Sequence, residues 1–320
     1  MSKKYIEDYK PCVKFDEKQL PYMELGDGSV VRLERYVEPD EKTKEKAKRE
    51  LRETDDVKEK AMNELRALIA KENGLHLPTD EEYMVMFLRP CKFYPDSCMK
   101  RIKNFYNLKY KYGIVCDEIT PNNCRQVFEK ELISLIPYRD PEGRRVMFIE
   151  AGKKWKPSQV PLEEIFKAVQ LLVLASMAEP MTQINGAVVV IDMLDLPLSH
   201  VVQFTPHFAA MILEYVQDCI LMRLKAVHIV NNSYIFNMIF AIFKPFIREK
   251  LRKRIFFHGK DMKSFHKHIP RDILPPKYDG TFDVPLPPGK IAAEMFDAYK
   301  KEFDLINTYG YAEDRKKLKS

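Results

Sequence analysis

Two aspartates and a serine–histidine pair are the side chains of this 320-residue chain that come nearest to a catalytic arrangement. Asp192 and Asp195 follow an apolar run that is typical of a buried strand, and functional carboxylates often lie at strand ends. They suit loop capping equally well, and no nucleophile or base is spaced to work with them. Ser199 and His200 are adjacent, so they point in different directions and form no nucleophile–base pair. We therefore predict no catalytic residue and expect a protein that is not an enzyme.

Metal and nucleotide sites are not indicated either. His258, His266 and His268 would share a metal only if folding brought them together, and no cysteine or acid stands at ligand spacing from them. We expect surface or capping roles for these histidines. The six cysteines form no CxxC pair, and neither GxGxxG nor GxxxxGK[ST] occurs. The sequence thus predicts no metal and no cofactor.

A basic segment at residues 244–254 is the first pattern that points to a ligand. It holds six basic side chains and one acid, Glu249. Ile247 and Leu251 would share one face of a helix, so the segment can rest on a core while its charges reach outward to phosphate. A plain solvated charged face is the alternative.

An almost wholly apolar helix is expected directly before this segment, over residues 234–243. Asn231, Asn232 and Ser233 supply turn and N-cap chemistry between it and a short apolar strand at 226–230. One interpretation is an ordinary core helix. The other is a flap with one face on a lipid pocket and the other able to touch a bilayer, since ten residues are too few to span one.

Composition and charge limit the partners. The net charge of +6 allows anionic partners, while acids alternate with bases along most of the chain and the aromatic–arginine pattern of RNA readers is absent, so we expect no nucleic acid. The Met-Ser-Lys-Lys start without an apolar run after it predicts no secretory signal, and hence reduced thiols and a cytoplasmic location.

The elements that must position these residues fall into four predicted regions. Residues 1–39 form an extended lead-in, 40–137 a helical module, 138–283 an α/β domain, and 284–320 a C-terminal helix (291–299) with a basic tail (315–319). In the module we expect one long helix over 40–71. In the α/β domain we expect strands at 145–150, 187–193, 226–230 and 254–258 and helices at 161–178 and 198–219, which favours a mostly parallel sheet.

Ordered fragments along residues 80–283 resemble the CRAL-TRIO (Sec14-like) lipid-transfer family. They resemble most the branch that contains α-tocopherol transfer protein, cellular retinaldehyde-binding protein and the clavesins. The fragments are Phe87-Leu88-Arg89, Lys92-Phe93, Asp140, Gly143-Arg144, Asn185-Gly186, Ile191-Asp192, Arg223-Leu224-Lys225, His228-Ile229-Val230-Asn231, Tyr234-Ile235-Phe236, Lys244-Pro245-Phe246, Lys250, Asp272-Ile273-Leu274-Pro275, Tyr278 and Gly280.

This resemblance implies a helical module packed on an α/β domain whose mostly parallel sheet floors an apolar cavity closed by a mobile helix. The mobile gate helix would be 234–243, with Phe236, Ile239, Phe240 and Phe243 as its gate residues. A basic cleft beside it would bind phosphoinositide head groups through Arg223, Lys250 and Arg254, helped by Lys225 and Arg252. The pocket residues implied are Phe166, Val169, Val173, Val189, Ile191, Leu196, Ile212, Tyr215, Val216, Ile220, Leu224 and Val227; plain core packing is the alternative for each.

Three positions depart from the family pattern. Pro90-Cys91 replaces the usual Ala-Arg, so a basic contact from the helical module is missing at Cys91. Leu221 stands where proline is common. Asp279 stands where a closing Gly-Gly begins, so it would carry strain of about a kcal/mol if that position takes a positive φ.

Our leading hypothesis is a monomeric carrier of a hydrophobic small molecule, such as tocopherol, a retinoid or a similar isoprenoid lipid. It would release its ligand at phosphoinositide-containing membranes, on endosomes or elsewhere, to which it attaches transiently. Three alternatives stay open: a phosphatidylinositol carrier of Sec14 type, a ligand-free protein–protein adaptor or small-GTPase regulator, and an enzyme acting on a lipid head group.

Overall fold

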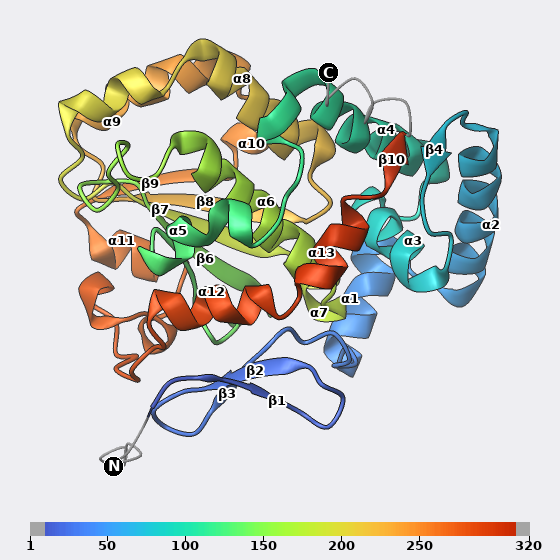
Figure 1. The fold of residues 1–320 in the computed structure, drawn as a ribbon, viewed down its shortest axis with the longest axis horizontal. Coiled ribbons are helices and arrows are strands. Elements are labelled where there is room, and N and C mark those ends of the chain that lie inside the picture. The colour runs from blue at the N-terminus through green and yellow to red at the C-terminus, as the bar shows by residue number, and fades with distance from the viewer. Residues whose placement is uncertain (1–9, 312–320) are drawn as a thin grey trace.

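The computed structural model describes residues 10–311, and these begin with a small antiparallel sheet (Figure 1). Its strands, in spatial order, are β1 (Val13–Phe15), β2 (Pro21–Glu24) and β3 (Val30–Val31). The turn between β2 and β3 depends on Gly28, whose φ is +82°, and on Asp27, whose Oδ1 accepts a hydrogen bond from the Ser29 amide (3.1 Å). We had expected an extended or loosely packed lead-in here. Strands this short leave little periodic signal in the sequence.

The helical module follows and is built on two helices where one was predicted. The module comprises α1 (Glu41–Leu51), α2 (Asp55–Lys71), β4 (Leu75–His76), α3 (Glu81–Leu88), η1 (Arg89–Cys91) and α4 (Pro95–Tyr112). The single helix expected over 40–71 is wrong because Arg52 adopts a left-handed conformation (φ 65°) that ends α1. Thr54 then caps α2 by accepting a hydrogen bond from the Val57 amide.

A five-stranded sheet forms the centre of the α/β domain, with strand order β5-β6-β7-β8-β9. The strands are β5 (Ile133–Leu135), β6 (Arg145–Glu150), β7 (Ala187–Asp192), β8 (Leu224–Val230) and β9 (Ile255–Gly259). β5 is antiparallel to β6 and every other pair is parallel. The apolar runs that predicted buried strands arise because both faces of the sheet are covered by other elements.

Helical segments cover one face of the sheet. They are α6 (Leu162–Met177), the 3-10 helix η4 (Leu198–Gln203), α8 (Pro206–Glu214), the π-helical turn η5 (Tyr215–Cys219), α9 (Tyr234–Phe243), η6 (Lys244–Phe246) and α10 (Glu249–Arg252). The continuous helix expected over 198–219 is therefore divided into three. Thr205 caps the new helix α8, which has Pro206 in its first turn.

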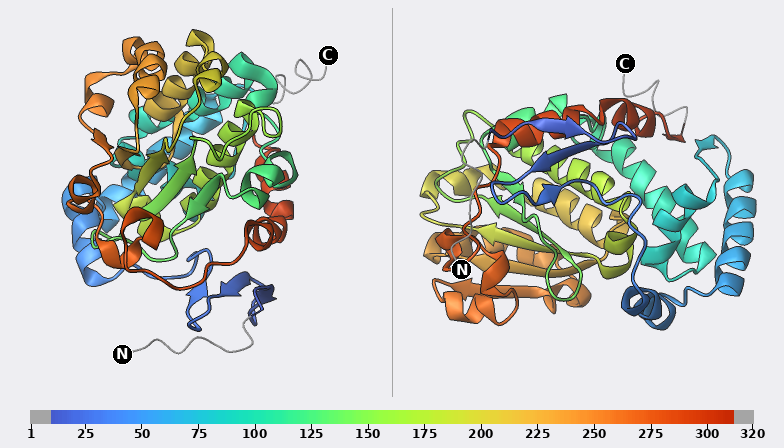
Figure 2. Two further views of the ribbon diagram at one scale, coloured as in Figure 1. Left: turned by 90° about the vertical axis from the view of Figure 1, so that its left-hand side faces the viewer. Right: turned by 90° about the horizontal axis from the view of Figure 1, so that it is seen from below.

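The opposite face of the sheet is covered by short elements: α11 (Met262–His266), η7 (Arg271–Ile273) and η8 (Pro276–Tyr278). The positive φ considered for Asp279 is observed, at 52°, directly after η8. The left view of Figure 2 shows the strands of the sheet between the helices above them and these short elements below.

The C-terminal segment returns to the helical module. After α12 (Gly289–Asp297) and α13 (Lys300–Ile306), strand β10 (Gly310–Tyr311) pairs antiparallel with β4. The α12 helix stacks Phe296 on Phe128 of α5 (Arg125–Glu129), with ring centroids 4.8 Å apart. The basic tail predicted at 315–319 lies outside the described residues.

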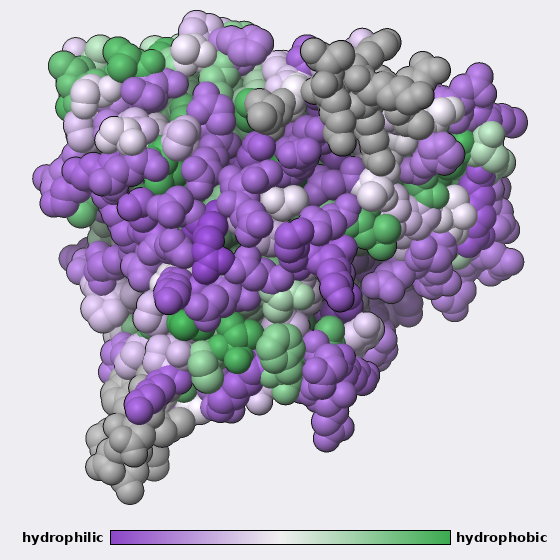
Figure 3. Space-filling view, in the orientation of Figure 1, coloured by the Kyte–Doolittle hydropathy of each residue, from purple (hydrophilic) through white to green (hydrophobic). Residues whose placement is uncertain are grey.

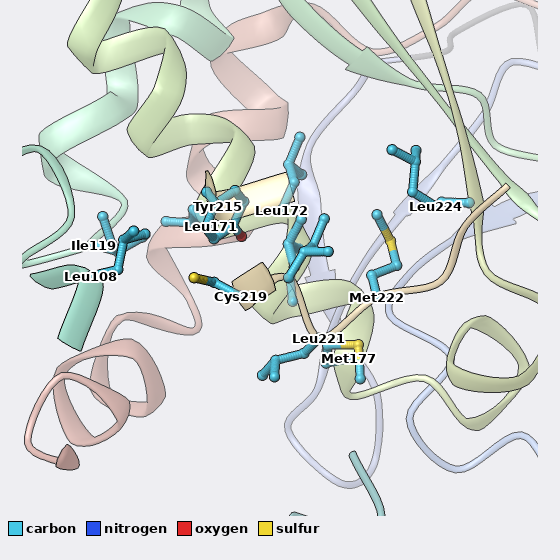
Figure 4. Packing of buried hydrophobic residues seen from close by; sticks show 14 of the residues in the cluster. Leu108, Ile119, Leu171, Leu172, Met177, Tyr215, Cys219, Leu221, Met222 and Leu224 are labelled. Carbon is cyan, nitrogen blue, oxygen red and sulfur yellow. The ribbon is translucent and has the colours of Figure 1, made fainter. Parts of the chain in front are cut away.

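Apolar packing and a few charged contacts join the module to the sheet domain. Leu108 and Ile119 of the helical side meet Leu171, Tyr215 and Cys219 of the α/β domain in one continuous buried cluster (Figure 4). The Arg89 guanidinium spans the joint, pairing with Glu53 (2.7 Å) and donating to Gln183. Glu179, buried in the same region, pairs with Arg145 and Arg139, and the latter also pairs with Glu34 of the N-terminal segment.

Candidate functional site

An apolar cavity of about 260 Å³ lies between the sheet and helices α6, α8 and α9. Its floor is made of alternate residues of three parallel strands, among them Ile149 of β6, Ile191 of β7 and Val227 of β8. Because successive side chains of a strand point to opposite faces of the sheet, the neighbours of these floor residues lie on the face away from the cavity. None of the helices in residues 10–311 is long and apolar enough to cross a membrane.

Every pocket residue implied by the resemblance lines this cavity except Leu196. Those that do are Phe166, Val169, Val173, Val189, Ile191, Ile212, Tyr215, Val216, Ile220, Leu224 and Val227. Leu196 is buried instead in a small cluster with Met193 and Ile239, because it follows the loop after β7 and packs beside the cavity rather than against it. Sequence reasoning missed further lining residues from other segments, such as Trp155, Phe204 and Ile255.

Helix α9 closes the cavity with the four gate residues. Phe236, Ile239, Phe240 and Phe243 all line it. On the outer side of the same helix Tyr234 is 78% exposed and Met238 is 40% exposed. The helix is therefore apolar toward the cavity and also toward solvent, which an ordinary core helix is not.

A second exposed apolar element stands beside α9. In the 3-10 helix η4, Leu198 is 59% and Val202 is 76% exposed. Phe204, which follows η4, packs edge-on against Phe243 of α9 with ring centroids 6.0 Å apart. The space-filling view shows apolar surface at the corner where α8 and α9 lie (Figure 3). The sequence signal for this element is the spacing of Leu198 and Val202, which are four residues apart.

The start of α9 is fixed to the strands by side-chain amides. Asn231, with φ 54°, donates from Nδ2 to Asp192 Oδ1 (2.8 Å), and Asn232 Oδ1 accepts from the Gly259 amide (2.9 Å). Asp192 also accepts from the Leu194 amide (2.9 Å) and the Tyr278 hydroxyl (3.0 Å). The carboxylate at the end of β7 thus has a structural role in holding the turn before α9.

A basic cleft of about 200 Å³ lies between the helical module, β8 and α10. Four of the five predicted phosphoinositide residues line it: Arg223, Lys225, Lys250 and Arg254. Arg252 does not line it. Arg252 is an exposed residue near the end of α10, a turn of helix that brings Lys250 and Leu251 to the cleft instead.

The helical module contributes two cations to the cleft that sequence reasoning missed. Lys92 and Arg101 both line it, and Arg101 Nη1 donates to the Ile220 carbonyl (2.6 Å). The departure at Cys91 is real, since that side chain is buried. The module nevertheless reaches the cleft with positive charge from the next residue and from one turn of α4. Only the tertiary packing of the module reveals this.

An internal carboxylate neutralises part of the cleft. Glu50 of α1 pairs with Arg223 (2.6 Å) and Lys225 (3.3 Å). Burial raises the pKa of Glu50, but the hydrogen bond from Arg223 and the charge of Lys225 outweigh it and lower that pKa to about 2.

Another cation of the cleft, Arg248, pairs with Asp218. The cations that remain lie close together and pair with no acid among residues 10–311. Arg254 donates to the Leu224 carbonyl, and its pKa is lowered by burial and by Arg223. Burial and the charges of Arg254, Arg101 and Lys92 lower the pKa of Lys250, which pairs with no acid among residues 10–311. Mutual repulsion of this kind favours a bound anion.

The cleft and the cavity share a wall. Both are lined by Val216, Ile220, Met222, Leu224 and Leu251. On β8 the alternation places Leu224 between the two cations Arg223 and Lys225. The physical consequence is that an anion in the cleft and an apolar ligand in the cavity would be separated by a single layer of side chains.

The histidines have local partners. The surface or capping role expected for His258 is wrong, because that side chain is buried between its partners. His258 is hydrogen-bonded through Nε2 to Nδ1 of His228 (2.9 Å) and through Nδ1 to the Ser264 hydroxyl (2.9 Å). His266 is hydrogen-bonded to the Tyr278 carbonyl (2.8 Å). In the part of the chain that the structure describes, no three His, Cys, Asp or Glu side chains are grouped so as to hold a metal ion. His200, next to Ser199, is buried against Trp155, with ring centroids 4.9 Å apart.

Comparison with known proteins identifies the family. A family model described as CRAL/TRIO domain matches residues 129–280. Alpha-tocopherol transfer protein-like of Mus musculus is 35% identical over 74% of this chain and 69% of that protein, and its Homo sapiens counterpart is 34% identical over the same shares. Clavesin-2 of Mus musculus is 27% identical over 83% of this chain and 81% of that protein. A solved structure described as "Crystal structure of Sfh5" aligns with a TM-score of 0.42 at 12% identity over 73% of this chain and 85% of that one. The resemblance drawn from the sequence is confirmed: the chain belongs to the CRAL/TRIO family of lipid-binding proteins.

Proposed function

We propose that this protein carries a hydrophobic small molecule between membranes and releases it at membranes that contain phosphoinositides. The observation that carries the proposal is the juxtaposition of an apolar cavity under α9 with a cation-lined cleft that shares its wall. The mouse and human relatives named tocopherol transfer protein-like support a ligand of the tocopherol, retinoid or isoprenoid kind.

The cavity supports carriage in preference to a ligand-free adaptor. An adaptor would be expected to fill the space beneath α9 with side chains, whereas about 260 Å³ is open there. Burying ten methylene groups of a ligand would contribute on the order of 8 kcal/mol at about 0.8 kcal/mol each. Escape into water would be slow, so release needs contact with a bilayer.

The surface around the gate supports such a contact. Leu198 and Val202 lie on η4, which contacts α9, the helix that carries Tyr234 and Met238, and all four are exposed apolar or aromatic residues. Large exposed apolar groups at one corner of a protein favour insertion among lipids. We propose that these residues enter the bilayer and that α9 moves aside when they do.

The basic cleft supplies the selectivity for anionic membranes. Each cation close to an acidic bilayer adds about 1 kcal/mol of attraction. Lys250 and Arg254, which pair with no acid in the described part of the chain, would together account for about 2 kcal/mol, or roughly thirtyfold in membrane affinity. In the cell we propose a cytoplasmic monomer that visits endosomal or other phosphoinositide-bearing membranes.

The test is a transfer assay with the double variant Lys250→Ala/Arg254→Ala. We expect it to extract a fluorescent isoprenoid from neutral vesicles as the unmodified protein does, and to lose the acceleration of delivery by phosphoinositide in acceptor vesicles. A matched control is Arg252→Ala/Lys253→Ala, which removes two charges of the same segment that do not line the cleft. If phosphoinositide accelerates delivery equally for both double variants, the proposed release mechanism is wrong.

A second candidate function is favoured by the shared wall. A phosphatidylinositol molecule would place its acyl chains in the cavity and its head group toward Arg223 and Lys250, if the side chains between the two spaces parted. Mass spectrometry of organic extracts from the purified protein separates the candidates. A stoichiometric phosphatidylinositol supports this second function, and a stoichiometric isoprenoid supports the first.

A further inference from the structure

The wall of the cavity under α9 presents only hydrocarbon. Among residues 10–311, no nitrogen or oxygen atom is exposed on it. We propose that the cavity selects cargo whose enclosed part is pure hydrocarbon, and that it discriminates against a ligand that must bury a hydroxyl or carbonyl group there. This inference rests on the proposed carrier function and narrows its ligand class.

Two lining residues have polar atoms, and both turn them elsewhere. Trp155 donates its indole N–H to the Val160 carbonyl (2.8 Å). Tyr215 is fully buried, and burial followed by the nearby thiols of Cys219 and Cys116 raises its pKa well above the ordinary value. Neither thiol borders the cavity. Because no oxygen atom is exposed on the wall, Tyr215 contributes ring carbon to it, and its buried hydroxyl has no hydrogen-bond partner among residues 10–311.

The backbone offers nothing more to a ligand. The floor strands β6, β7 and β8 are central in the sheet, so their amides and carbonyls are engaged in ladders on both sides. The helices α6, α8 and α9 satisfy their backbone groups internally except at their ends. A hydrogen-bonding group of the cargo therefore has a partner only outside this cavity, at its mouth, in the bilayer or in the cleft.

The cost of burying an unpaired hydroxyl sets the expected discrimination. In a bilayer an alcohol keeps its hydroxyl at the watery interface, whereas inside this wall the hydroxyl would lose every hydrogen bond. Protein data for such burial correspond to about tenfold or more in an equilibrium constant. The preference must appear between two ligands that differ in this group alone.

Phytane and phytanol are such a pair, because they share a branched C20 skeleton and differ by one hydroxyl. The full chain, stripped of lipid, is mixed with phosphatidylcholine vesicles that contain both compounds in equal amounts. The protein is then separated from the vesicles and its cargo is quantified by mass spectrometry. We expect the protein-to-vesicle ratio to be about tenfold higher for phytane than for phytanol. An equal or higher ratio for phytanol overturns the inference while leaving the carrier function intact, and capture of neither compound contradicts the carrier function itself.

Substitutions that move one hydroxyl sharpen the test. Val189 lines the cavity floor, while Val188, its neighbour on β7, lies on the other face of the sheet. Val189→Thr, which adds a hydroxyl at similar volume, should reduce the preference for phytane severalfold, and Val188→Thr should leave it unchanged. A fall in phytanol capture in Tyr215→Phe would show that this hydroxyl serves the ligand, and would overturn the inference. If Val189→Thr does not fold, the phytane-to-phytanol ratio of the unmodified protein remains decisive.

Discussion

The two faces of the central sheet have the same kind of residues but different packing. On one face Val188 and Val190 are fully buried, and Phe148 stacks on Tyr278 with ring centroids 4.7 Å apart. On the other face the alternating residues of the same strand, Val189 and Ile191, border an open cavity. Hydrophobic alternation is therefore identical for a solid core and for a ligand site.

The difference comes from what covers each face. The solid face is covered by residues 262–278, which insert Phe265, Ile273 and Tyr278 directly onto the strands. The hollow face is covered by α6, α8 and α9, whose side chains line the cavity without filling it. Close packing is the normal state of a protein interior, so the exception marks the candidate ligand-binding face.

The largest expected effect contrasts a ring on each face. Phe148→Ala on the solid face should lower the free energy of unfolding by about 3–5 kcal/mol, because it leaves a cavity in a dense cluster. Phe240→Ala on the gate helix should cost only about 1 kcal/mol, since its ring is half-buried beside a space that already exists. Urea denaturation of both variants measures the contrast. Similar losses would show that the two faces are equally well packed.

The next contrast adds volume instead of removing it. Val190→Phe on the solid face should destabilise the protein by about 1–3 kcal/mol through overpacking, whereas Val189→Phe should cost less because its ring enters the cavity. Val189→Phe should also reduce capture of phytane roughly tenfold, since it occupies the space that the ligand needs. Thermal unfolding and the vesicle assay provide the two readouts. Undiminished capture by Val189→Phe would place the ligand elsewhere.

The smallest expected effect is a pH dependence that belongs to the solid face. Burial, followed by the charges of His258, His268 and Arg144, lowers the pKa of His228 to about 3. In the unfolded chain this pKa is about 6.5, so the unfolded state takes up the proton first. Stability from the neutral imidazole is thus complete above pH 6.5 and is lost as the pH falls toward 3, by about 1 kcal/mol between pH 6.5 and 5.5.

The variant His228→Phe isolates this contribution. Its urea midpoint should vary less with pH over that range than the midpoint of the unmodified protein, because the group that titrates is gone. An unchanged pH profile in His228→Phe would mean that another group is responsible. The cavity face offers a natural reference, since the buried Tyr215 is the one titratable side chain among the described residues that line its wall.

Much of the fold and of the cleft was predictable from local pattern. The apolar run at 234–243 is α9 with the same bounds, and the run that begins at Ala187 is a central parallel strand. Arg223 and Lys225 flank a residue that must be buried, and so do Lys250 and Arg254. For this reason the two pairs of cations line the same cleft. Patterns of this kind extend over a few residues. The period of the helix or strand then determines which face of the element those residues occupy.

Other features depended on contacts between distant segments. Lys92 and Arg101 reach the cleft only because the helical module docks there, and Glu50 neutralises two of its cations for the same reason. Arg252 was assigned to the cleft by its neighbourhood in sequence, but its position in the turn of α10 directs it to solvent. The N-terminal sheet likewise was not predicted, because its strands are too short to give a periodic pattern in the sequence.

The amino-acid sequence by itself determined which residues are apolar, which are charged, and in what order strands and helices alternate. The family and the bounds of α9 followed from this. Whether the buried faces are filled or hollow was decided only by the tertiary structure. The reason is that a cavity forms where side chains from distant segments do not pack against one another. No single stretch of chain contains that information.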